Sequence, residues 1–369
     1  MPSVLFTAST FSHIISFHLP YLRRFRELGW QVEVACGGAM RDIPFADAVV
    51  ALPLEKKISA PSNFRAASLL RRRMEREHYD LVVTHTTLAA FFTRWAMRGM
   101  RTRPRVVDVV HGYLFDDGTQ GLKRLLLTEA ERLTAPQTDL LLTMNAWDTQ
   151  WAAAHRAAAR VEEIPGMGVD LSRFQAVEEK RQAMREKLGL AEQDVALIYP
   201  AEFGPRKDQA TLLRAVPLLP QRVKLLLPGR GELLDRCRQQ AAALGVADRV
   251  ILPEFVHNSP DWLAAADISV SSSWKEGLPF HIMEAMACGL PAVVTAIKGH
   301  TDLVGPENGL LVPCRDENAF AAAIQKLADQ PSLRARLGEA GRRKVQRYGL
   351  ETVLPQVMER YLSVLDGGK

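Results

Sequence analysis

Two glutamates and a short turn between them form the most chemically suggestive segment of the sequence. Glu276 is followed by Gly277, Leu278 and Pro279, and Glu284 comes eight residues after Glu276. The segment follows the run ISVSSS, so Glu276 is expected in a loop at the carboxyl end of a buried strand. Gly277 permits a tight turn, and Pro279 suits the first position of a helix. Glu284 then lies about 7.5 Å further along that helix.

This arrangement has the chemistry of a site for a phosphorylated sugar. A helix start can hold a pyrophosphate on its free N–H groups, and carboxylates accept hydrogen bonds from sugar hydroxyls. Solvated positions in a loop and on a helix are the alternative for the two glutamates. Because methionine and alanine stand on both sides of Glu284, a functional position is favoured for that carboxylate.

The elements that position these residues alternate between strands and helices. Apolar runs typical of buried strands are separated by segments with helical spacing, in the first half of the sequence and again in the second. Such alternation predicts parallel sheets with helices on both faces. The expected strands are SVLFTA, QVEVACG, DAVVALPL, DLVVTHT, RVVDVVHG and DLLLTMN, then VALIYPAEF, VKLLLPGRG, RVILPEF, ISVSSS and PAVVTA.

The fold class is therefore α/β, with two Rossmann-like, doubly wound domains. The length of 369 residues exceeds what one ordinary core needs. The sheet pattern breaks near Gly166 and Gly168, and a boundary is expected close to Leu171. The predicted domains are 1–171, completed by a C-terminal helix at about 350–369, and 172–349. If the ligand-binding ends of both sheets face each other, the active site lies in a central cleft.

Composition excludes several protein classes. The apolar fraction of 47% and the charged fraction of 24% are those of a soluble globular protein. No apolar run reaches the roughly 18–20 residues that span a bilayer, and the start of the chain resembles a buried strand more than a signal peptide. A cytoplasmic location is expected. Cys36, Cys237, Cys288 and Cys314 form no CxxC pair and are expected to be buried free thiols.

Positive charge gathers between Lys57 and Arg105, where eleven Lys and Arg residues stand against three acidic residues. A solvated helix face is the ordinary explanation for such a run. The alternative is a surface that attracts anionic lipid head groups or a pyrophosphate. Nucleic acid is disfavoured, because the run is expected to lack interleaved exposed aromatic residues and has no recognised binding motif. Arg71–Arg105 is therefore a candidate for peripheral contact with the inner face of a membrane.

The segment 266–313 resembles the donor-binding half of the family-4 glycosyltransferases, and is similar to capsule and exopolysaccharide types. Their signature is two glutamates separated by seven residues, which Glu276 and Glu284 match. The resemblance implies the GT-B fold, a retaining reaction, and a UDP-sugar as donor substrate with no further cofactor. It also implies that Glu284 binds the ribose hydroxyls. Glu276 would contact the transferred sugar in a catalytic role, and Gly277, Leu278 and Pro279 would belong to the nucleotide-sugar-binding site.

The resemblance continues through PAEFGPRKDQATLLRA and LLLPGRGEL. It implies phosphate binding by Lys207, a catalytic role because an ammonium there neutralises the departing diphosphate. Arg206 and Gly229 also fall on the nucleotide-sugar side. Many family members carry an arginine five residues before this lysine, where the present sequence has Glu202. Arg206 is the expected replacement, and solvated basic residues remain the alternative for both cations.

The first predicted domain contributes polar residues after its strands. His111 follows RVVDVVHG and matches the family's first-domain histidine, which lies near the donor sugar and the reacting centre. The resemblance thus implies a catalytic role for His111. His13 occupies the first strand–helix turn, where many relatives have a glycine-rich loop. It is expected on the acceptor side, together with His85 and Asn145, and plain packing is the alternative.

A metal-dependent transferase would carry acidic ligands such as DxD after a strand. The acidic pair considered for such a motif, Asp116 and Asp117, lies in YLFDDGTQG without flanking strands. We interpret it as a turn and expect no essential divalent cation.

The expected activity is transfer of a hexose or N-acetylhexosamine from a UDP-sugar to a lipid-linked or oligosaccharide acceptor in surface-glycan synthesis. A nucleotide-sugar 2-epimerase on the same scaffold and a non-catalytic nucleotide-sugar-binding subunit are the alternatives. The EGLP and EAMA segments favour transfer over epimerisation. The presence of Glu276, Lys207 and His111 together disfavours a non-catalytic subunit. A nicotinamide dehydrogenase is disfavoured because the first strand–turn lacks GxGxxG.

Overall fold

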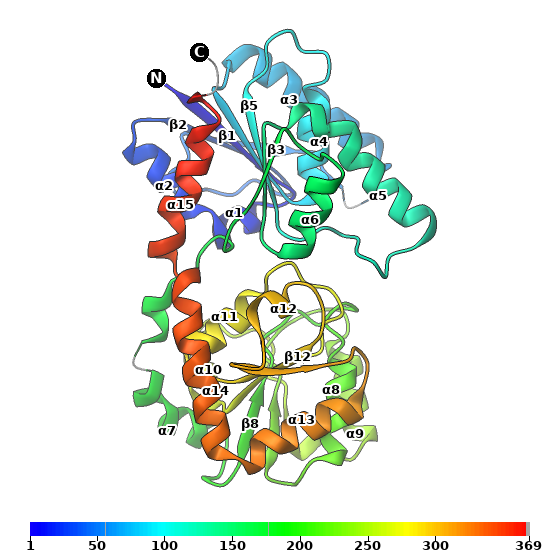
Figure 1. Ribbon diagram of the computed structural model, residues 1–369, viewed down its shortest axis with the longest axis vertical. Helices are drawn as coiled ribbons and strands as arrows, with labels where there is room; N and C mark the ends of the chain where they lie inside the picture. The colour runs from blue at the N-terminus through cyan, green and yellow to red at the C-terminus, as the bar shows by residue number, and fades with distance from the viewer. Residues whose placement is uncertain (56, 176, 367–369) are drawn as a thin grey trace. The chain divides into compact units, whose positions relative to one another are not determined.

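The computed structural model describes residues 1–55, 57–175 and 177–366, which divide into two compact units (Figure 1). Unit 1 comprises Met1–Met167 together with 351–366, and unit 2 comprises Gly168–Leu350. Each unit contains one sheet of parallel strands with helices on both faces. The α/β architecture predicted from strand–helix alternation is confirmed.

Unit 1 has, within its described residues, a seven-stranded sheet in the order β3-β2-β1-β4-β5-β6-β7. The central strand β1 pairs in parallel with β2 and with β4. All six residues of β1 are buried, which explains why its sequence is almost continuously apolar. The strands are β1 (Ser3–Ala8), β2 (Gln31–Gly37), β3 (Ala48–Leu52), β4 (Leu81–His85), β5 (Arg105–Val110), β6 (Leu140–Thr143) and β7 (Arg160–Glu163).

The last helix of the chain packs in unit 1, beside α2 (Figure 1). The Tyr361 ring lies 6.2 Å from the ring of Phe25 and 5.9 Å from that of Tyr21, centroid to centroid. All three rings are buried, so this helix completes the core of unit 1. The helices are α1 (Phe11–Phe17), α2 (Leu19–Glu27), α3 (Pro61–Glu77), α4 (Thr87–Ala96), α5 (Gly121–Thr134), α6 (Ala146–Ala154) and α15 (Leu350–Ser363).

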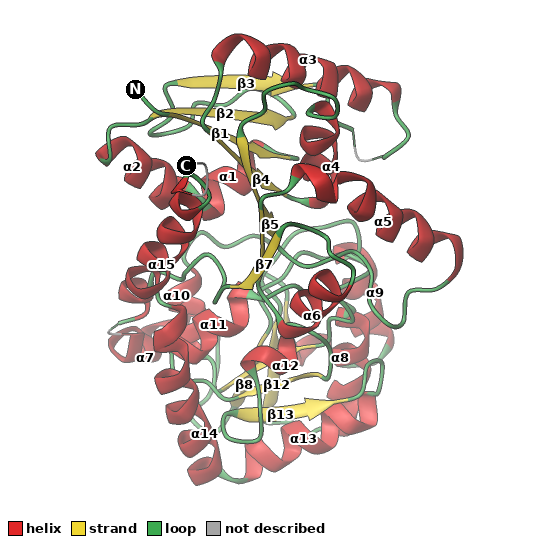
Figure 2. Ribbon diagram, turned by 45° about the horizontal axis from the view of Figure 1, so that its top comes forward, coloured by secondary structure: helices red, strands yellow, loops and turns green. Residues whose placement is uncertain are grey.

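Unit 2 has, in the part of the chain that is described, a six-stranded sheet in the order β10-β9-β8-β11-β12-β13 (Figure 2). Leu197, Leu225 and Phe320 belong to the core between this sheet and its helices. The strands are β8 (Val195–Ile198), β9 (Val223–Leu226), β10 (Val250–Ile251), β11 (Ile268–Ser271), β12 (Ala292–Thr295) and β13 (Gly309–Val312). The helices are α7 (Val177–Lys187), α8 (Gln209–Ala215), α9 (Leu234–Ala243), α10 (Ser259–Ala265), α11 (Phe280–Ala287), α12 (His300–Leu303), α13 (Glu317–Asp329) and α14 (Pro331–Lys344).

Edge strands account for the differences between the predicted and the observed sheets. Strands β7 and β13 were absent from the prediction: β7 has the polar sequence RVEE, and β13, with the sequence GLLV, was missed. Strand β3 was expected to be buried, and that expectation is wrong: of its five residues, Leu52 alone is buried. A central strand of a parallel sheet pairs on both sides and is covered on both faces, whereas an edge strand pairs on one side and is less completely covered. Its sequence therefore needs less apolar character.

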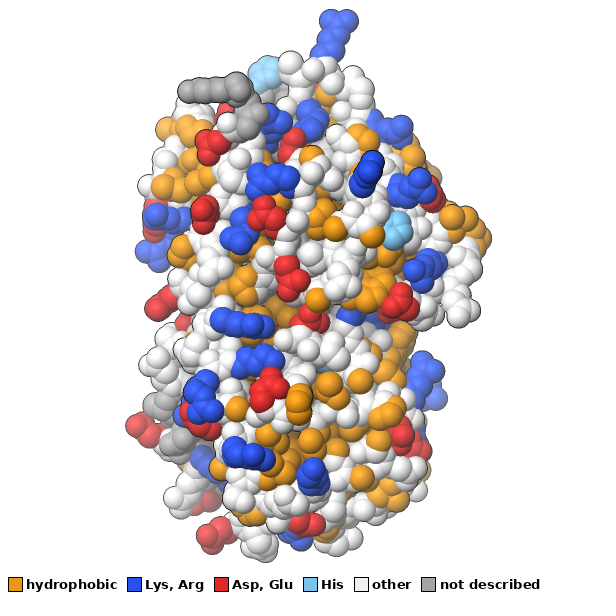
Figure 3. Space-filling model, viewed as in Figure 1, with side chains coloured by type: hydrophobic (Ala, Val, Ile, Leu, Met, Phe, Trp, Pro, Cys, Tyr) orange, Lys and Arg blue, Asp and Glu red, His pale blue; other side chains and the backbone are white. Residues whose placement is uncertain are grey.

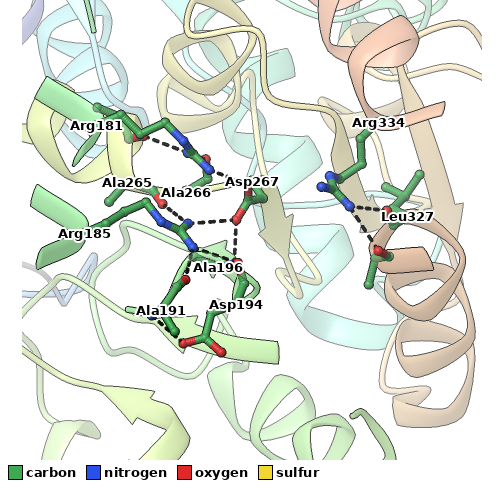
Figure 4. A network of polar contacts seen from close by, with 12 residues as sticks. Arg181, Arg185, Ala191, Asp194, Ala196, Ala265, Ala266, Asp267, Leu327 and Arg334 are labelled. Atoms are coloured by element: carbon green, nitrogen blue, oxygen red, sulfur yellow. Dashed lines mark hydrogen bonds and ion pairs between the residues drawn. The ribbon is translucent and has the colours of Figure 1, made fainter. Parts of the chain in front are cut away.

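A network of polar contacts fastens α7 to unit 2 (Figure 4). Arg181 and Arg185 each form an ion pair with Asp267, at 2.7 Å and 3.2 Å. Asp267 also accepts a hydrogen bond from the backbone N–H of Ala196 at 2.8 Å. Because Ala196 and Asp267 stand at the amino ends of β8 and β11, the network occupies that edge of the sheet. The carboxyl ends of the same strands lead into the candidate site.

The cysteines differ in exposure. All four are free thiols; Cys36, Cys237 and Cys288 are buried, but Cys314 is exposed. The expectation that all four are buried is therefore wrong for Cys314. This residue follows β13 in the connection to α13, outside the core.

Candidate active site

The loop between β11 and α11 carries the first predicted carboxylate. Helix α11 begins at Phe280, and Pro279 precedes it as the N-cap residue with extended backbone angles. The expectation that Pro279 is the first helical residue is therefore wrong by one position. Its ψ of 115° keeps it outside the helix, while its fixed φ of −76° is compatible with either position. Glu276 lies in the loop and Glu284 in the second turn of α11.

Lys207 and Glu276 meet although 69 residues separate them. Lys207 belongs to a tight turn between β8 and α8, at the carboxyl end of the neighbouring strand of the sheet. Its Nζ lies 2.5 Å from Glu276 Oε1, and Ser273 Oγ donates to the same oxygen at 2.6 Å. Ser273 Oγ in turn lies 2.6 Å from the Tyr199 hydroxyl. The predicted lysine and glutamate thus form one hydrogen-bonded group.

The charges of this group are set by burial and by pairing. Burial acts to raise the pKa of Glu276, but the nearby positive charge of Lys207 and its hydrogen bond outweigh burial and hold the pKa at about 2. Glu276 is therefore an anion at every physiological pH. It can accept hydrogen bonds or stabilise positive charge, but it cannot donate a proton at neutral pH.

A second loop closes over the first one. Gly299 has φ of +82°, and a Cβ there would lie 2.5 Å from the carbonyl oxygen of Gly277. No other residue fits at this position without a shift of the backbone. His300 directly follows Gly299 and is buried, and its Nδ1 lies 2.9 Å from the carbonyl oxygen of Thr295. Burial lowers the pKa of His300 to about 4 and that of His281 to about 3, so both rings are neutral.

Glu284 differs sharply from Glu276. Burial raises the pKa of Glu284 to about 7, opposed by the charge of Arg173, which follows the hinge segment in η2 (Leu171–Phe174). Within the described residues, no hydrogen bond or ion pair reaches its carboxylate. A largely buried acid without a donor is unfavourable in its charged form. The side chain is therefore prepared to accept hydrogen bonds from outside the protein.

The other predicted nucleotide-sugar residues of unit 2 surround these two carboxylates unequally. Leu278 is buried, as is Pro279. Arg206 is exposed beside Lys207, and its carbonyl oxygen accepts from the backbone N–H of Trp274 at 3.0 Å. Gly229 follows β9, and a Cβ there would lie 1.9 Å from the carbonyl oxygen of Ala201. Gly229 therefore allows two loops to pack backbone against backbone.

The predicted histidines of unit 1 lie together at the carboxyl end of its sheet. His13 is in α1, His85 ends β4, and His111 follows β5. His111 Nε2 lies 3.3 Å from His13 Nε2 and 3.2 Å from His85 Nδ1. His18, which the sequence analysis gave no role, joins them by stacking on His85 with ring centroids 3.7 Å apart.

Asn145 has a structural task. It is the N-cap of α6, and its Oδ1 accepts from the backbone N–H of Asp148 at 2.9 Å while its Nδ2 donates to the Asp148 carboxylate at 2.8 Å. The side chain is fully buried. Because both ends of the amide are engaged in the cap, we do not carry Asn145 into the acceptor side.

The predicted basic surface Arg71–Arg105 is divided by the fold. Arg94 is fully buried, and forms ion pairs with Asp108 at 3.1 Å and Glu131 at 2.9 Å. It therefore cannot belong to a surface. Several other members are paired with acids: Arg71 with Glu75, Arg73 with Glu33, Arg76 with Glu77, and Arg103 and Arg105 with Asp139. Exposed cations remain at Arg72, Arg98 and Arg101.

Several residues of the site escaped the sequence analysis. Tyr199 and Ser273 orient Glu276, while His281 and His300 each keep a buried Nε2 without a partner among the described residues. Ser273 and His281 stand within or next to the segment that was singled out, but serine and histidine are common there as packing residues. Tyr199 and His300 come from other strand ends, so they become visible only in three dimensions.

Comparisons with known proteins agree with this geometry. Residues 180–344 match the family Glycosyl transferases group 1, and residues 21–173 match Glycosyltransferase Family 4. The putative glycosyltransferase EpsD of Bacillus subtilis (strain 168) is 32% identical over 370 residues, covering 98% of this chain and 97% of that protein. The UDP-Gal:alpha-D-GlcNAc-diphosphoundecaprenol alpha-1,3-galactosyltransferase of Escherichia coli is 24% identical over 320 residues, covering 84% and 82%.

Solved structures share the fold. The crystal structure of HepE from Anabaena in complex with UDP matches with a TM-score of 0.78 and 21% identity, covering 98% of this chain and 100% of that chain. Two Rossmann-like parallel sheets and this similarity show the GT-B fold. The chain belongs to the family-4 glycosyltransferases. The family that the segment 266–313 resembles is thus confirmed.

Proposed function

We propose that the protein is a retaining glycosyltransferase that moves a hexose or N-acetylhexosamine from a UDP-sugar to a hydroxyl of a lipid-diphosphate-linked or polysaccharide acceptor. The observation that carries the proposal is the pair of unlike carboxylates in unit 2. Glu276 is held ionised by Lys207, and Glu284 has no hydrogen-bond donor among the residues that the structure describes. HepE has been solved with UDP-glucose, and the Escherichia coli relative is named for a UDP-Gal donor and a diphosphoundecaprenol acceptor, which supports the choice of substrates.

In the proposed reaction the two carboxylates have separate roles. Glu284 accepts hydrogen bonds from the ribose diol, and Glu276 accepts them from hydroxyls of the transferred sugar. Lys207 shares its ammonium between Glu276 and the diphosphate, and stabilises the negative charge that appears when the glycosidic bond breaks. With a pKa of about 2, Glu276 stabilises an oxocarbenium-like sugar as an anion. Departure and attack on the same face of the sugar then retain the anomeric configuration, and no divalent cation takes part in donor binding.

The test of the donor site uses the pKa of Glu284. Ribose hydroxyls favour the charged carboxylate, so binding of UDP-glucose is expected to lower its pKa from about 7 and to release protons. The affinity for UDP-glucose should therefore rise as the pH increases from 6 to 8. Isothermal titration calorimetry in buffers of different ionisation enthalpy measures both the affinity and the protons released.

Glu284→Gln is the decisive variant, because the amide cannot ionise. It should bind UDP-glucose roughly tenfold more weakly at pH 8 or worse, and with no proton release, since a charge-assisted hydrogen bond contributes about 1.5–3 kcal/mol. Glu192→Gln, an exposed position in unit 2, is the matched control. An unchanged pH dependence in Glu284→Gln would remove the ribose role. Epimerised UDP-sugar without net transfer would instead point to a 2-epimerase.

The proposed lipid-linked acceptor implies contact with a membrane. No helix among the described residues is long and apolar enough to cross one. Helix α5, however, presents Leu122, Leu125, Leu126 and Leu133 to solvent, with 47–69% of each side chain exposed. Figure 3 shows hydrophobic side chains at the outer edge of unit 1 over α5. A helix with an apolar stripe beside cations such as Lys123 can lie in the interfacial layer of a bilayer.

Membrane contact through α5 has a direct test in vesicle sedimentation. The double variant Leu122→Ser/Leu126→Ser is expected to lower the vesicle-bound fraction several-fold, because it removes two of the exposed apolar side chains. Leu218→Ser, which changes a leucine of unit 2 that is 53% exposed, should bind like the unmodified protein. Vesicles with and without anionic lipid separate the part of Arg72, Arg98 and Arg101 from that of the leucines. Equal and negligible binding in all samples contradicts the proposal.

A further inference from the structure

Four of the nine histidines in the chain gather in unit 1. They come from four different places in the sequence: His13 from α1, His18 from the junction of α1 and α2, His85 from the end of β4, and His111 from the loop after β5. One ring nitrogen of each lies within 4.8 Å of the corresponding nitrogens of the others. The fold thus gathers four nitrogen atoms that can act as metal ligands.

Hydrogen bonds within the cluster do not use its capacity. His111 Nε2 faces both His13 Nε2 and His85 Nδ1, but a neutral ring nitrogen offers one proton or one lone pair and forms one good bond. Among the described residues, neither ring nitrogen of His18 has a partner, nor does Nε2 of His85, although all are buried. Such orphaned atoms cost free energy. A ligand bound by one ring nitrogen of His18 would recover part of it.

The distances fit a tetrahedrally coordinated ion. Zn–N bonds of about 2.0–2.1 Å in a tetrahedron place neighbouring nitrogens roughly 3.3–3.4 Å apart. The two separations around His111 Nε2 are 3.3 Å and 3.2 Å. His18 stacks on His85 at a centroid distance of 3.7 Å, so its ring needs to rotate before a nitrogen reaches the same point. Two of the separations among His13, His85 and His111 therefore already fit such an ion.

The chemistry of the set selects the kind of ion. All four side chains are imidazoles, which bind metal ions through a ring nitrogen in the neutral form. No carboxylate belongs to the set. Imidazole ligands suit Zn²⁺, Co²⁺, Ni²⁺ and Cu²⁺, whereas Mg²⁺ and Ca²⁺ prefer oxygen.

We propose that His13, His18, His85 and His111 form a binding site for one transition-metal ion of the Zn²⁺ type. The site shares no residue with the proposed donor site of unit 2. It is also unlike the acidic DxD type of metal site, because its four ligands are all histidines. Ion binding stands independently of the proposed function. A further consequence rests on the proposed function, with His13 on the acceptor side and His111 in a catalytic role as the family resemblance implies. A bound ion would occupy the ring nitrogens of both residues, so metal loading inhibits transfer.

The experiment uses full-length, untagged protein that has been dialysed against a chelator and then titrated with Co²⁺. We expect the intense visible absorption of tetrahedral Co²⁺, saturation at one equivalent, and displacement by Zn²⁺. His18→Ala and His13→Asn should each weaken Co²⁺ binding at least about tenfold, because each removes one ligand. His257→Ala, at an exposed histidine of unit 2, should leave binding unchanged.

The variants also separate loss of binding from loss of folding. His13 is half-buried, so His13→Asn tests the site even if the removal of the buried His18 ring perturbs the fold, which circular dichroism reports. Weak absorption that does not saturate, or wild-type affinity in both variants, overturns the proposal. If one equivalent of Zn²⁺ binds and transfer continues unchanged, the metal site stands and the catalytic use of His111 falls. If no ion binds but His111→Ala abolishes transfer, the metal site falls and the proposed function stands.

Discussion

Replacing Lys207 by Met is expected to lower kcat for sugar transfer by roughly 10²–10³, the usual effect of removing one group that stabilises developing negative charge. The ammonium of Lys207 lies 2.5 Å from Glu276 and is the nearest described cation to that carboxylate. Without it the diphosphate departs with its charge uncompensated, and the pKa of Glu276 rises from about 2 because burial is opposed less strongly. Steady-state measurement of UDP release, together with UDP affinity, checks the expectation.

The double variant Lys207→Met/Glu276→Gln separates two explanations for a loss of UDP affinity, because UDP carries no transferred sugar for Glu276 to contact. If Lys207 acts on the diphosphate, the double variant regains stability but not UDP affinity, since the unpaired carboxylate is gone while the cation is still missing. Recovery of UDP affinity would mean that the lysine does no more than neutralise its partner. Lys326→Met, at an exposed lysine of α13, is the control, and more than a tenth of the wild-type kcat in Lys207→Met argues against the phosphate role.

Replacing Arg94 by Met is expected to destabilise unit 1 by about 3–5 kcal/mol, the usual loss when one partner of a buried ion pair is removed. The guanidinium is fully buried between Asp108 on β5 and Glu131 on α5. Burial raises the pKa of Glu131 even with Arg94 present. Without the cation, two buried carboxylates face each other, and α5 loses its main polar attachment to the core. Calorimetry of thermal unfolding measures the effect, with the transition of unit 2 as an internal reference.

The pH dependence of the Arg94 effect has a definite sign. Glu131 has a raised pKa in the folded protein, so its charged form opposes folding above its ordinary pKa and protonation relieves the strain as the pH falls. The difference in stability between Arg94→Met and the unmodified protein should therefore shrink between pH 8 and pH 5. Arg98→Met, at an exposed arginine 4.5 Å from the ring centroid of Trp95, should cost much less. A loss below about 1 kcal/mol for Arg94→Met at pH 8 would show that the buried pair is not needed.

The sequence was sufficient to predict the carboxylates, the lysine and the alternating architecture. Glu276 and Glu284 share one strand–loop–helix segment, so their spacing along the chain fixes their spacing in space. Parallel strands bring their carboxyl ends to one edge of a sheet, which is why Lys207, on the neighbouring strand, reaches Glu276. Local geometry and one rule of topology thus account for the grouping of Lys207 and the two glutamates, whose role in donor binding remains the proposal.

The remaining features depend on contacts that the sequence does not encode locally. Glu276 and Glu284 are the same residue type, yet their pKa values differ. The pKa of Glu276 is about 2 because Lys207 lies beside it, whereas that of Glu284 is about 7 because no described cation is close enough to pair with it. Arg94 stands in a run of arginines that reads as a surface, and its two acidic partners lie in β5 and α5. Pairings of this kind become visible only after the chain has folded.

Unit 1 is built from two separate segments of the chain, and the whole of unit 2 lies between them in the sequence. The outgoing and returning segments are joined where Val169 N–H donates to the carbonyl oxygen of Tyr348 at 2.9 Å and Leu350 N–H donates to that of Val169 at 2.8 Å. During synthesis the whole of unit 2 leaves the ribosome before α15 does, so Tyr21 and Phe25 remain uncovered until Tyr361 arrives. The half of the enzyme that is translated first is therefore the half that matures last, and a stalled nascent chain displays an aromatic surface to chaperones.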